Sequence, residues 1–220
     1  PTSANHRTTQ SFYLDDITSG YDCAAYGNPG LGFSNLYPWA YFDGDEYFVY
    51  ADDAQFDING SGINDGMESA TYAGITMGGW FNLTDASDTQ YLISKWATDE
   101  RSYLLKVESS KPNMSISDDG TAGAHEDNVA HTTKMEDGER HFVVGRWTAS
   151  EKSVFLDNVE VSAASTLASI YNGTANFRIC AGNATGFVTG YASLVFISCA
   201  GCSDSIINNL WQISHELFNK

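Results

Sequence analysis

The sequence has no long apolar run and few basic residues. No stretch of about 18 apolar residues occurs in the chain, which predicts no transmembrane helix. Lys and Arg number 11 against 28 Asp and Glu, so the net charge is −17. A nucleic-acid-binding protein needs a basic patch, and an anionic membrane repels an acidic surface. The shortage of basic and of long apolar segments argues against nucleic-acid binding and against membrane insertion. The excess of acidic residues favours solubility and Ca²⁺ binding.

Cysteine is also scarce. There is one C-x-x-C pair, whereas a zinc ribbon needs a second pair and a thioredoxin-like site needs a βαβ unit. Neither zinc binding nor dithiol chemistry is therefore predicted. Buried free thiols are expected, and one or two disulfides are the alternative. The four cysteines are Cys23, Cys180, Cys199 and Cys202.

The common catalytic patterns are missing. The chain contains neither a G-x-S-x-G elbow nor an H-E-x-x-H pair. A glycosidase needs two carboxylates a short distance apart. No such run lies on a predicted strand, and the close acidic group within KMEDGER at 134–140 is predicted to form a turn. His125 and His131 lie in the polar segment AGAHEDNVAHTT, where a solvated loop is expected. An enzyme is therefore not predicted.

Short runs rich in Tyr, Phe, Val and Ile dominate the sequence from residue 39 onward, separated by Gly, Asp, Asn and Ser. Such runs predict β-strands joined by turns. In 102–108, Tyr103, Leu105 and Val107 alternate with residues of the other face, and Asp157-Asn158 suits a tight hairpin turn. The predicted strands are 39–44, 47–51, 75–81, 90–96, 102–108, 113–119, 140–147, 153–161, 176–182 and 191–198.

One helix is predicted, at the C-terminus. Ser203 or Asp204 is suited to cap it. Apolar residues follow at helical spacing and predict a stripe that packs onto a sheet. The stripe consists of Ile206, Leu210, Ile213 and Leu217.

This pattern predicts an all-β fold, a two-sheet antiparallel jelly-roll sandwich with a short C-terminal helix. Residues 1–38 are rich in Gly, Asn and aromatics and are predicted to form an extended arm. Residues 39–220 are predicted to form the jelly-roll domain.

The order of the motifs from FDGDEYFVYADDAQFD through ITMGGWFN, QYLISKW, HFVVGRW and FRICAGN resembles the laminin-G-like branch of the concanavalin A-like jelly rolls, as found in bacterial surface and phage virion proteins. The resemblance covers about residues 39–218. It implies glycan or protein binding, often with a Ca²⁺ at the rim of the sandwich. Some distant relatives on this fold are glycan hydrolases or lyases. The final strand differs from the pattern, because Ser193 and Leu194 stand where an acidic pair is expected.

Two acidic loops are candidates for Ca²⁺, which prefers carboxylate and carbonyl oxygens. The first is Asp43-Gly-Asp45-Glu46 with Asp52, Asp53 and Asp57. Asp43, Asp45 and Asp52 are its predicted metal ligands. The second carries Asp85 and Asp88, which are also predicted to contact a ligand.

A sugar site needs an aromatic platform beside polar groups. Trp39 and Tyr41 are the aromatic residues predicted to bind a ligand. Trp80, Trp96 and Trp147 lie on predicted strands and are expected to pack in the core.

The favoured function is a non-catalytic binding module for a glycan or a surface protein. It is expected outside the cell, on a virion surface as a decoration, fibre or adhesin, or on a bacterial cell surface. A virion or capsid protein is a further possible partner. The alternatives are a capsid-stabilising protein without a ligand and a polysaccharide hydrolase or lyase on the same fold.

Overall fold

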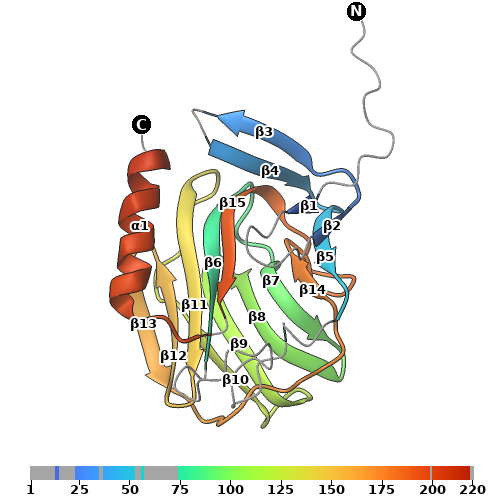
Figure 1. Ribbon diagram of the computed structural model, residues 1–220, viewed down its shortest axis with the longest axis vertical. Coiled ribbons are helices and arrows are strands. Elements are labelled where there is room, and N and C mark those ends of the chain that lie inside the picture. The colour runs from blue at the N-terminus through green and yellow to red at the C-terminus, as the bar shows by residue number, and fades with distance from the viewer. Residues whose placement is uncertain are drawn as a thin grey trace, which may run out of the picture.

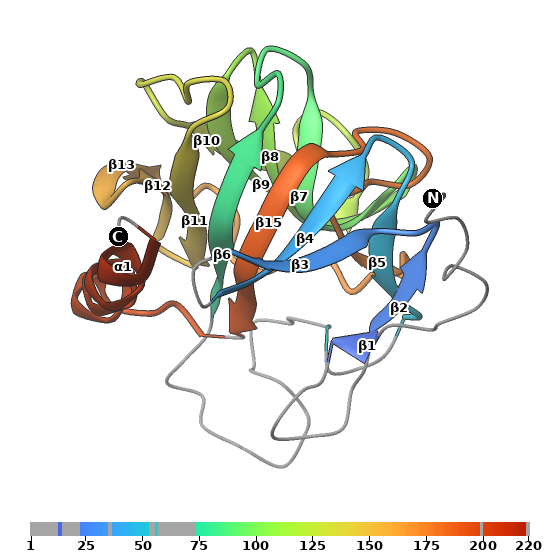
Figure 2. The ribbon, with the colours of Figure 1, turned by 90° about the horizontal axis from the view of Figure 1, so that it is seen from above.

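The protein folds as two antiparallel β-sheets packed face to face, with one helix on the outside (Figures 1 and 2). This computed structural model describes residues 13–14, 23–34, 37–52, 56, 74–198 and 200–218. The predicted jelly-roll sandwich with a C-terminal helix is confirmed.

The first sheet has eight strands in the order β1-β2-β5-β14-β7-β8-β9-β10. All its pairings are antiparallel, and neighbours in the chain such as β7, β8 and β9 pair directly. Its strands are β1 (Tyr13–Leu14), β2 (Cys23–Tyr26), β5 (Tyr47–Tyr50), β14 (Phe177–Ile179), β7 (Gln90–Ala97), β8 (Glu100–Glu108), β9 (Lys111–Gly120) and β10 (Glu126–Ala130).

The second sheet has seven strands in the order β13-β12-β11-β6-β15-β4-β3. Strand β6 lies at its centre, between β11 and β15. Its strands are β13 (Val159–Ala164), β12 (Glu151–Leu156), β11 (Arg140–Thr148), β6 (Gly74–Leu83), β15 (Thr189–Ser198), β4 (Tyr37–Asp43) and β3 (Gly30–Ser34).

The main core lies between the inner faces of the two sheets. Tyr103, Leu105 and Val107 of β8 all belong to it, as their alternation predicts. Trp147 of β11 is fully buried there, which confirms its expected role. Trp96 is also buried, with the Arg101 guanidinium 5.6 Å from its ring centroid.

Tight hairpins connect several strands. Asp157 and Asn158, between β12 and β13, have φ angles of 48° and 66°, so the predicted two-residue turn is confirmed. Ser109 and Ser110 make a similar turn between β8 and β9 with φ angles of 52° and 65°. Serine rarely adopts this conformation, so sequence alone did not indicate that turn.

Helix α1 (Asp204–Phe218) begins directly after Ser203, as predicted, but it presents a different face to the sheet. Ile206, Leu210 and Ile213 of the predicted stripe are exposed. The buried side chains are instead Ile207 and Ser214.

The reason lies in the second, smaller core that α1 covers on the outer face of the seven-stranded sheet. Its buried members are Trp80, Phe142, Val144, Phe155 and Ile207. The helix turns its Ile207 side inward to fill this aromatic layer. Spacing alone does not distinguish two neighbouring apolar stripes on one helix.

Strands also occur where loops were expected. Within the predicted arm 1–38, β2 pairs with β5 and β3 pairs with β4, so a boundary at residue 38 runs through the β3–β4 hairpin. Much of the remaining arm lies outside the described residues.

The segment expected to be a solvated loop around His125 and His131 contains β10. His125 is exposed as expected, but His131 is 2% exposed. Its Nδ1 accepts a hydrogen bond from the backbone N–H of Thr133, and its Nε2 lies 3.2 Å from the carbonyl oxygen of Val159. These contacts join the edges of the two sheets, so the expectation for His131 was wrong.

Cys180 and Cys202 carry free thiols in the structure. Cys180 is buried, as expected, whereas Cys202 is only partly buried. Burial raises the pKa of the Cys180 thiol well above its usual value. Cys23 is buried in the core, and Cys199 lies outside the described residues. The described residues contain no helix with the length and apolar character needed to span a bilayer.

Candidate functional site

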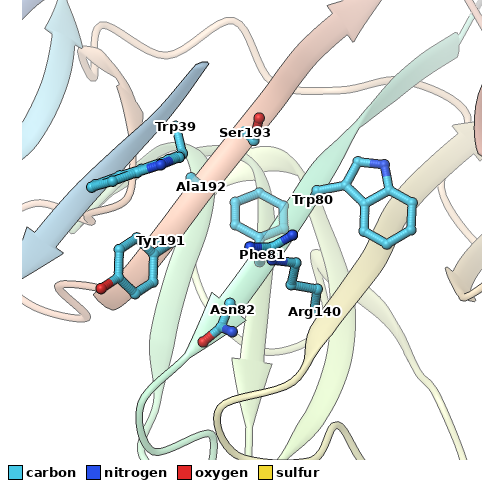
Figure 3. Close-up of a pocket in the computed structure, with 8 residues that line it drawn as sticks. All are labelled: Trp39, Trp80, Phe81, Asn82, Arg140, Tyr191, Ala192 and Ser193. Atoms are coloured by element: carbon cyan, nitrogen blue, oxygen red, sulfur yellow. The ribbon is translucent and has the colours of Figure 1, made fainter. Parts of the chain in front are cut away.

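A hollow on the outer face of the seven-stranded sheet is the candidate ligand site. Its volume is about 310 Å³. Trp39 of β4 borders it on one side and Trp80 of β6 on the other (Figure 3). The lining residues are Trp39, Trp80, Phe81, Asn82, Arg140, Tyr191, Ala192 and Ser193.

Strand register places polar and aromatic residues in two adjacent rows. In one row, Arg140 of β11 is paired with Asn82 of β6, and Asn82 is paired with Tyr191 of β15. In the next row, Trp80 is paired with Ser193. Residues two apart on a strand share a face, so both rows point away from the main core. A ligand on this face therefore meets hydrogen-bonding groups beside aromatic rings.

Two aromatic rings, Trp39 and Tyr191, line the side of the hollow near β4, and Tyr41 packs behind Tyr191. The ring of Trp39 meets Tyr191 edge-on, with centroids 5.0 Å apart and an interplanar angle of 82°. Tyr41 lies against the same Tyr191, also at 5.0 Å. Tyr191 is 41% exposed, so part of its ring is open to a ligand.

Gly32 of β3 makes room for the Trp39 ring. A Cβ atom at this position would lie 2.4 Å from Cζ2 of the indole. Any side chain on residue 32 would therefore push the indole away from β3.

Helix α1 holds the opposite side of the hollow in place. The indole N–H of Trp80 donates a hydrogen bond to Ser214 Oγ at 2.8 Å. Its ring lies 5.5 Å from that of Phe142, and only 4% of Trp80 is exposed. Trp80 thus acts as a fixed wall, while Tyr191 is an accessible surface.

The polar groups come from three strands. The Asn82 amide donates to the carbonyl oxygen of Gly138 at 2.6 Å, which orients its side chain. Arg140 is exposed, and Ser193 is half-buried. No carboxylate is among the eight lining residues.

The structure brings together one pair of the four predicted ligand-binding residues. Trp39 lines the hollow, and Tyr41 packs on Tyr191 beside it. Asp85 and Asp88 lie in the exposed β6–β7 loop and are not among the lining residues.

Asp85 instead makes a local turn. Hydrogen bonds from the hydroxyl and the backbone N–H of Ser87 hold the pKa of Asp85 below its usual value. The Asp85 carboxylate therefore stabilises the turn of its own loop.

Two of the three predicted metal ligands lie together in the β4–β5 turn. Asp43, Asp45 and Glu46 each offer an oxygen atom within 4.8 Å of the others. Asp52 is placed elsewhere, because its carboxylate accepts a hydrogen bond from Lys95 Nζ at 2.7 Å. The structure thus groups Glu46, and not Asp52, with the predicted pair.

Glu46 is the unusual member of this group. It is 6% exposed, and its carboxylate accepts a hydrogen bond from the backbone N–H of Asp43. Burial, followed by the neighbouring carboxyl groups of Asp43 and Asp45, raises the pKa of Glu46. Carboxylate oxygens that lie close together repel one another, and a hard cation such as Ca²⁺ binds such oxygens and relieves the repulsion.

A second group lies where β9 ends and the turn to β10 follows. Asp118, Asp119 and His125 are close together, and His125 Nδ1 lies 2.9 Å from Asp118. The backbone N–H of Thr121 lowers the pKa of Asp119. These contacts account for the turn without a ligand.

Sequence reasoning did not identify Asn82, Arg140 or Tyr191 as site residues. The available signal was the alternation of Tyr191 and Ser193 on a strand whose inner residues are apolar. What sequence did not show is that β11, β6, β15 and β4 are neighbours in one sheet.

The sequence was compared with known families. Residues 41–195 match a family model described as the concanavalin A-like lectin/glucanases superfamily. The chain belongs to this superfamily. No curated protein sequence shows a significant match.

Solved structures with the superfamily's sandwich include binding domains of botulinum neurotoxins. The serotype G binding domain aligns with a TM-score of 0.65 and 8% identity, covering 90% of this chain and 48% of that one. The binding domain of neurotoxin DC in complex with SialylT gives 0.62 and 11%, covering 89% and 48%. The same domain in complex with rat synaptotagmin II gives 0.63 and 10%, also covering 89% and 48%. The chain thus spans about half the length of these domains, and the likeness shows a common fold.

Proposed function

We propose that this protein is a non-catalytic glycan-binding module and that the sugar binds in the hollow between Trp39 and Trp80. The observation that carries the proposal is the partly exposed Tyr191 ring, which lies beside the polar row of Asn82 and Arg140. Sugar rings place their C–H faces on aromatic rings, while amides and charged groups fix the hydroxyls.

Binding is favoured over glycoside hydrolysis by the chemistry of the lining. Hydrolysis by the usual mechanism needs two carboxyl groups flanking the scissile bond. The eight residues that line the hollow include none. Ser193 occupies one of the positions where the resemblance led us to expect acids.

The test is binding of the purified chain to a glycan array, with isothermal titration of the best ligands. Trp39→Ala and Tyr191→Ala are expected to weaken binding by about tenfold or more, since stacking on an aromatic ring supplies on the order of 1–2 kcal/mol. Tyr26→Ala is the matched control, because Tyr26 is an exposed tyrosine of β2 in the other sheet. Normal binding by both site variants would disprove the location.

Protein recognition is the second form of a binding function. Among the structural relatives, one binding domain was solved with SialylT and the same domain with synaptotagmin II. A surface protein as partner, and display on a virion or bacterial surface, stay predictions. A pull-down from host cell surfaces, before and after glycosidase treatment, separates a glycan from a protein partner.

We also propose that Asp43, Asp45 and Glu46 hold a Ca²⁺ ion. The support is the convergence of three carboxylate groups within 4.8 Å and the raised pKa of the buried member. A bound Ca²⁺ would offset their mutual repulsion and fix the β4–β5 turn. Strand β4 carries Trp39, so the ion would stabilise the strand that bears one side of the hollow.

A further inference from the structure

Arg140 differs from the other residues of the hollow in its charge. It is the only one of the eight lining residues with a formal charge. The whole chain has 11 basic residues against 28 acidic ones, so a cation at this position stands out. Neutral sugars can be bound by amides and hydroxyls alone, whereas a guanidinium is the preferred partner of a carboxylate.

The position of Arg140 directs its charge at the ligand space. Its side chain runs from β11 across β6 toward the middle of the hollow (Figure 3). Neighbouring strands are about 4.8 Å apart, so Arg140 and Tyr191, two strands apart in one row, start roughly 10 Å from each other. A sugar ring on Tyr191 therefore lies within reach of the guanidinium.

No carboxylate is among the eight residues that line the hollow. Charges are screened over about 8 Å at physiological ionic strength, so carboxylates farther away than that contribute little to the potential in the hollow. A planar guanidinium gives a carboxylate two parallel N–H···O bonds, which adds orientation as well as affinity.

We propose that the hollow selects sugars that carry a carboxylate, such as uronic or sialic acids, and that Arg140 binds this group while the ring lies on Tyr191 and Trp39. The proposal rests on the proposed function of the hollow and adds the class of sugar to it.

The experiment compares acidic oligosaccharides with their methyl esters. Galacturonate, glucuronate and sialic acid oligosaccharides are immobilised beside the same molecules esterified at the carboxyl group. Each pair keeps the same ring and differs in the charge. The wild-type chain is expected to bind the acid of at least one pair about tenfold or more tightly than its ester.

Arg140→Gln is expected to remove this difference and leave acid and ester equally weak. Arg140→Lys should keep part of it, because an ammonium retains the charge but loses the paired geometry. Trp39→Ala should weaken acid and ester alike. Arg140 is exposed, so the two Arg140 substitutions should change the unfolding transition little, which circular dichroism checks.

The outcomes separate the two proposals. Equal binding of acids and esters by the wild type, or an acid preference that survives Arg140→Gln, overturns the role of Arg140 but leaves the glycan site standing. No binding to any sugar on the array, acidic or neutral, overturns the glycan site and this inference with it.

Discussion

The outer face of the seven-stranded sheet has two halves with similar composition and different surroundings. In the half under α1, Trp80, Phe142 and Phe155 are buried against the helix. In the half toward β4, Tyr191 and Trp39 pack on each other but stay partly open. The first half shows how this protein treats aromatic residues that serve stability, namely with full burial and a hydrogen bond for the indole. Among the residues that the structure describes, no helix covers the open half, which is why we assign it to a ligand.

The two halves also differ in how buried charge is handled. Arg146, 7% exposed beneath the start of α1, donates hydrogen bonds to the carboxylates of Glu151, Glu160 and Asp204. Glu46, buried in the β4–β5 turn, has acidic neighbours and a raised pKa. A buried cation that is paired with carboxylates is typical of a structural network. A buried carboxyl group with a shifted pKa is more often found at a functional site.

The largest expected difference between the halves is in stability. Trp80→Ala should lower the free energy of unfolding by about 3–5 kcal/mol, because it leaves a cavity and removes the hydrogen bond that the indole donates to Ser214. Tyr191→Ala should cost under about 1 kcal/mol, because the residue is 41% exposed. Urea unfolding followed by far-ultraviolet circular dichroism measures both. Equal losses would show that the open half is also a structural core.

A smaller effect is expected from the charge network that anchors α1. Arg146→Gln should cost about 1–3 kcal/mol, since it leaves three acidic groups without their cation, and these groups are partly exposed. Hydrogen exchange in α1 should speed up more than exchange in β8. Lys106→Gln is the control, because its pair with Glu108 lies near the surface and should contribute under about 1 kcal/mol. Unchanged exchange in α1 would mean that apolar packing alone holds the helix.

The smallest effect concerns Glu46 and depends on pH. The folded protein binds the Glu46 proton more tightly than the unfolded chain, because burial raises the pKa. The resulting stabilisation is present below the unfolded pKa and is lost as the pH rises through the folded pKa. In EDTA at pH near 7, Glu46→Gln should therefore be more stable than the wild type by up to about 1 kcal/mol.

Two further measurements sharpen this prediction. As the pH is lowered and the wild-type Glu46 carboxyl takes up its proton, the urea concentrations at which the two proteins unfold should become more similar. Addition of Ca²⁺ should stabilise the wild type and not the variant. A wild type more stable than the variant in EDTA would contradict the argument from burial, and equal stabilisation by Ca²⁺ would place the ion elsewhere.

Most strands could be predicted from local pattern. The runs 140–147 and 153–161 appear as β11, β12 and β13, because alternating or continuous β-branched and aromatic residues fit a pleated, buried surface. Strands β2, β3 and β10 were missed. Their Gly, Ala, Asp and Asn residues have low strand propensity, and their pairing with neighbours outweighs it.

The site was predictable only in part. Trp39 and Tyr41 were predicted by residue type, and the structure brings Trp39 to the hollow and Tyr41 beside it. Asp43 and Asp45 were predicted by their proximity in sequence, and the structure keeps them close together. Arg140 was not identified, because it is 58 positions from its register partner Asn82. Asp52 was grouped with Asp43 on sequence distance, whereas its carboxylate pairs with Lys95 across the fold.

The amino-acid sequence by itself determined that this chain forms an antiparallel sandwich with one C-terminal helix, since the side-chain period of each segment depends on neighbouring residues. Tertiary structure decided which face of α1 is buried, which acids lie together and which four strands build the hollow. These depend on contacts between residues far apart in the chain, where shape and the need to pair buried polar groups choose among patterns that are locally equivalent.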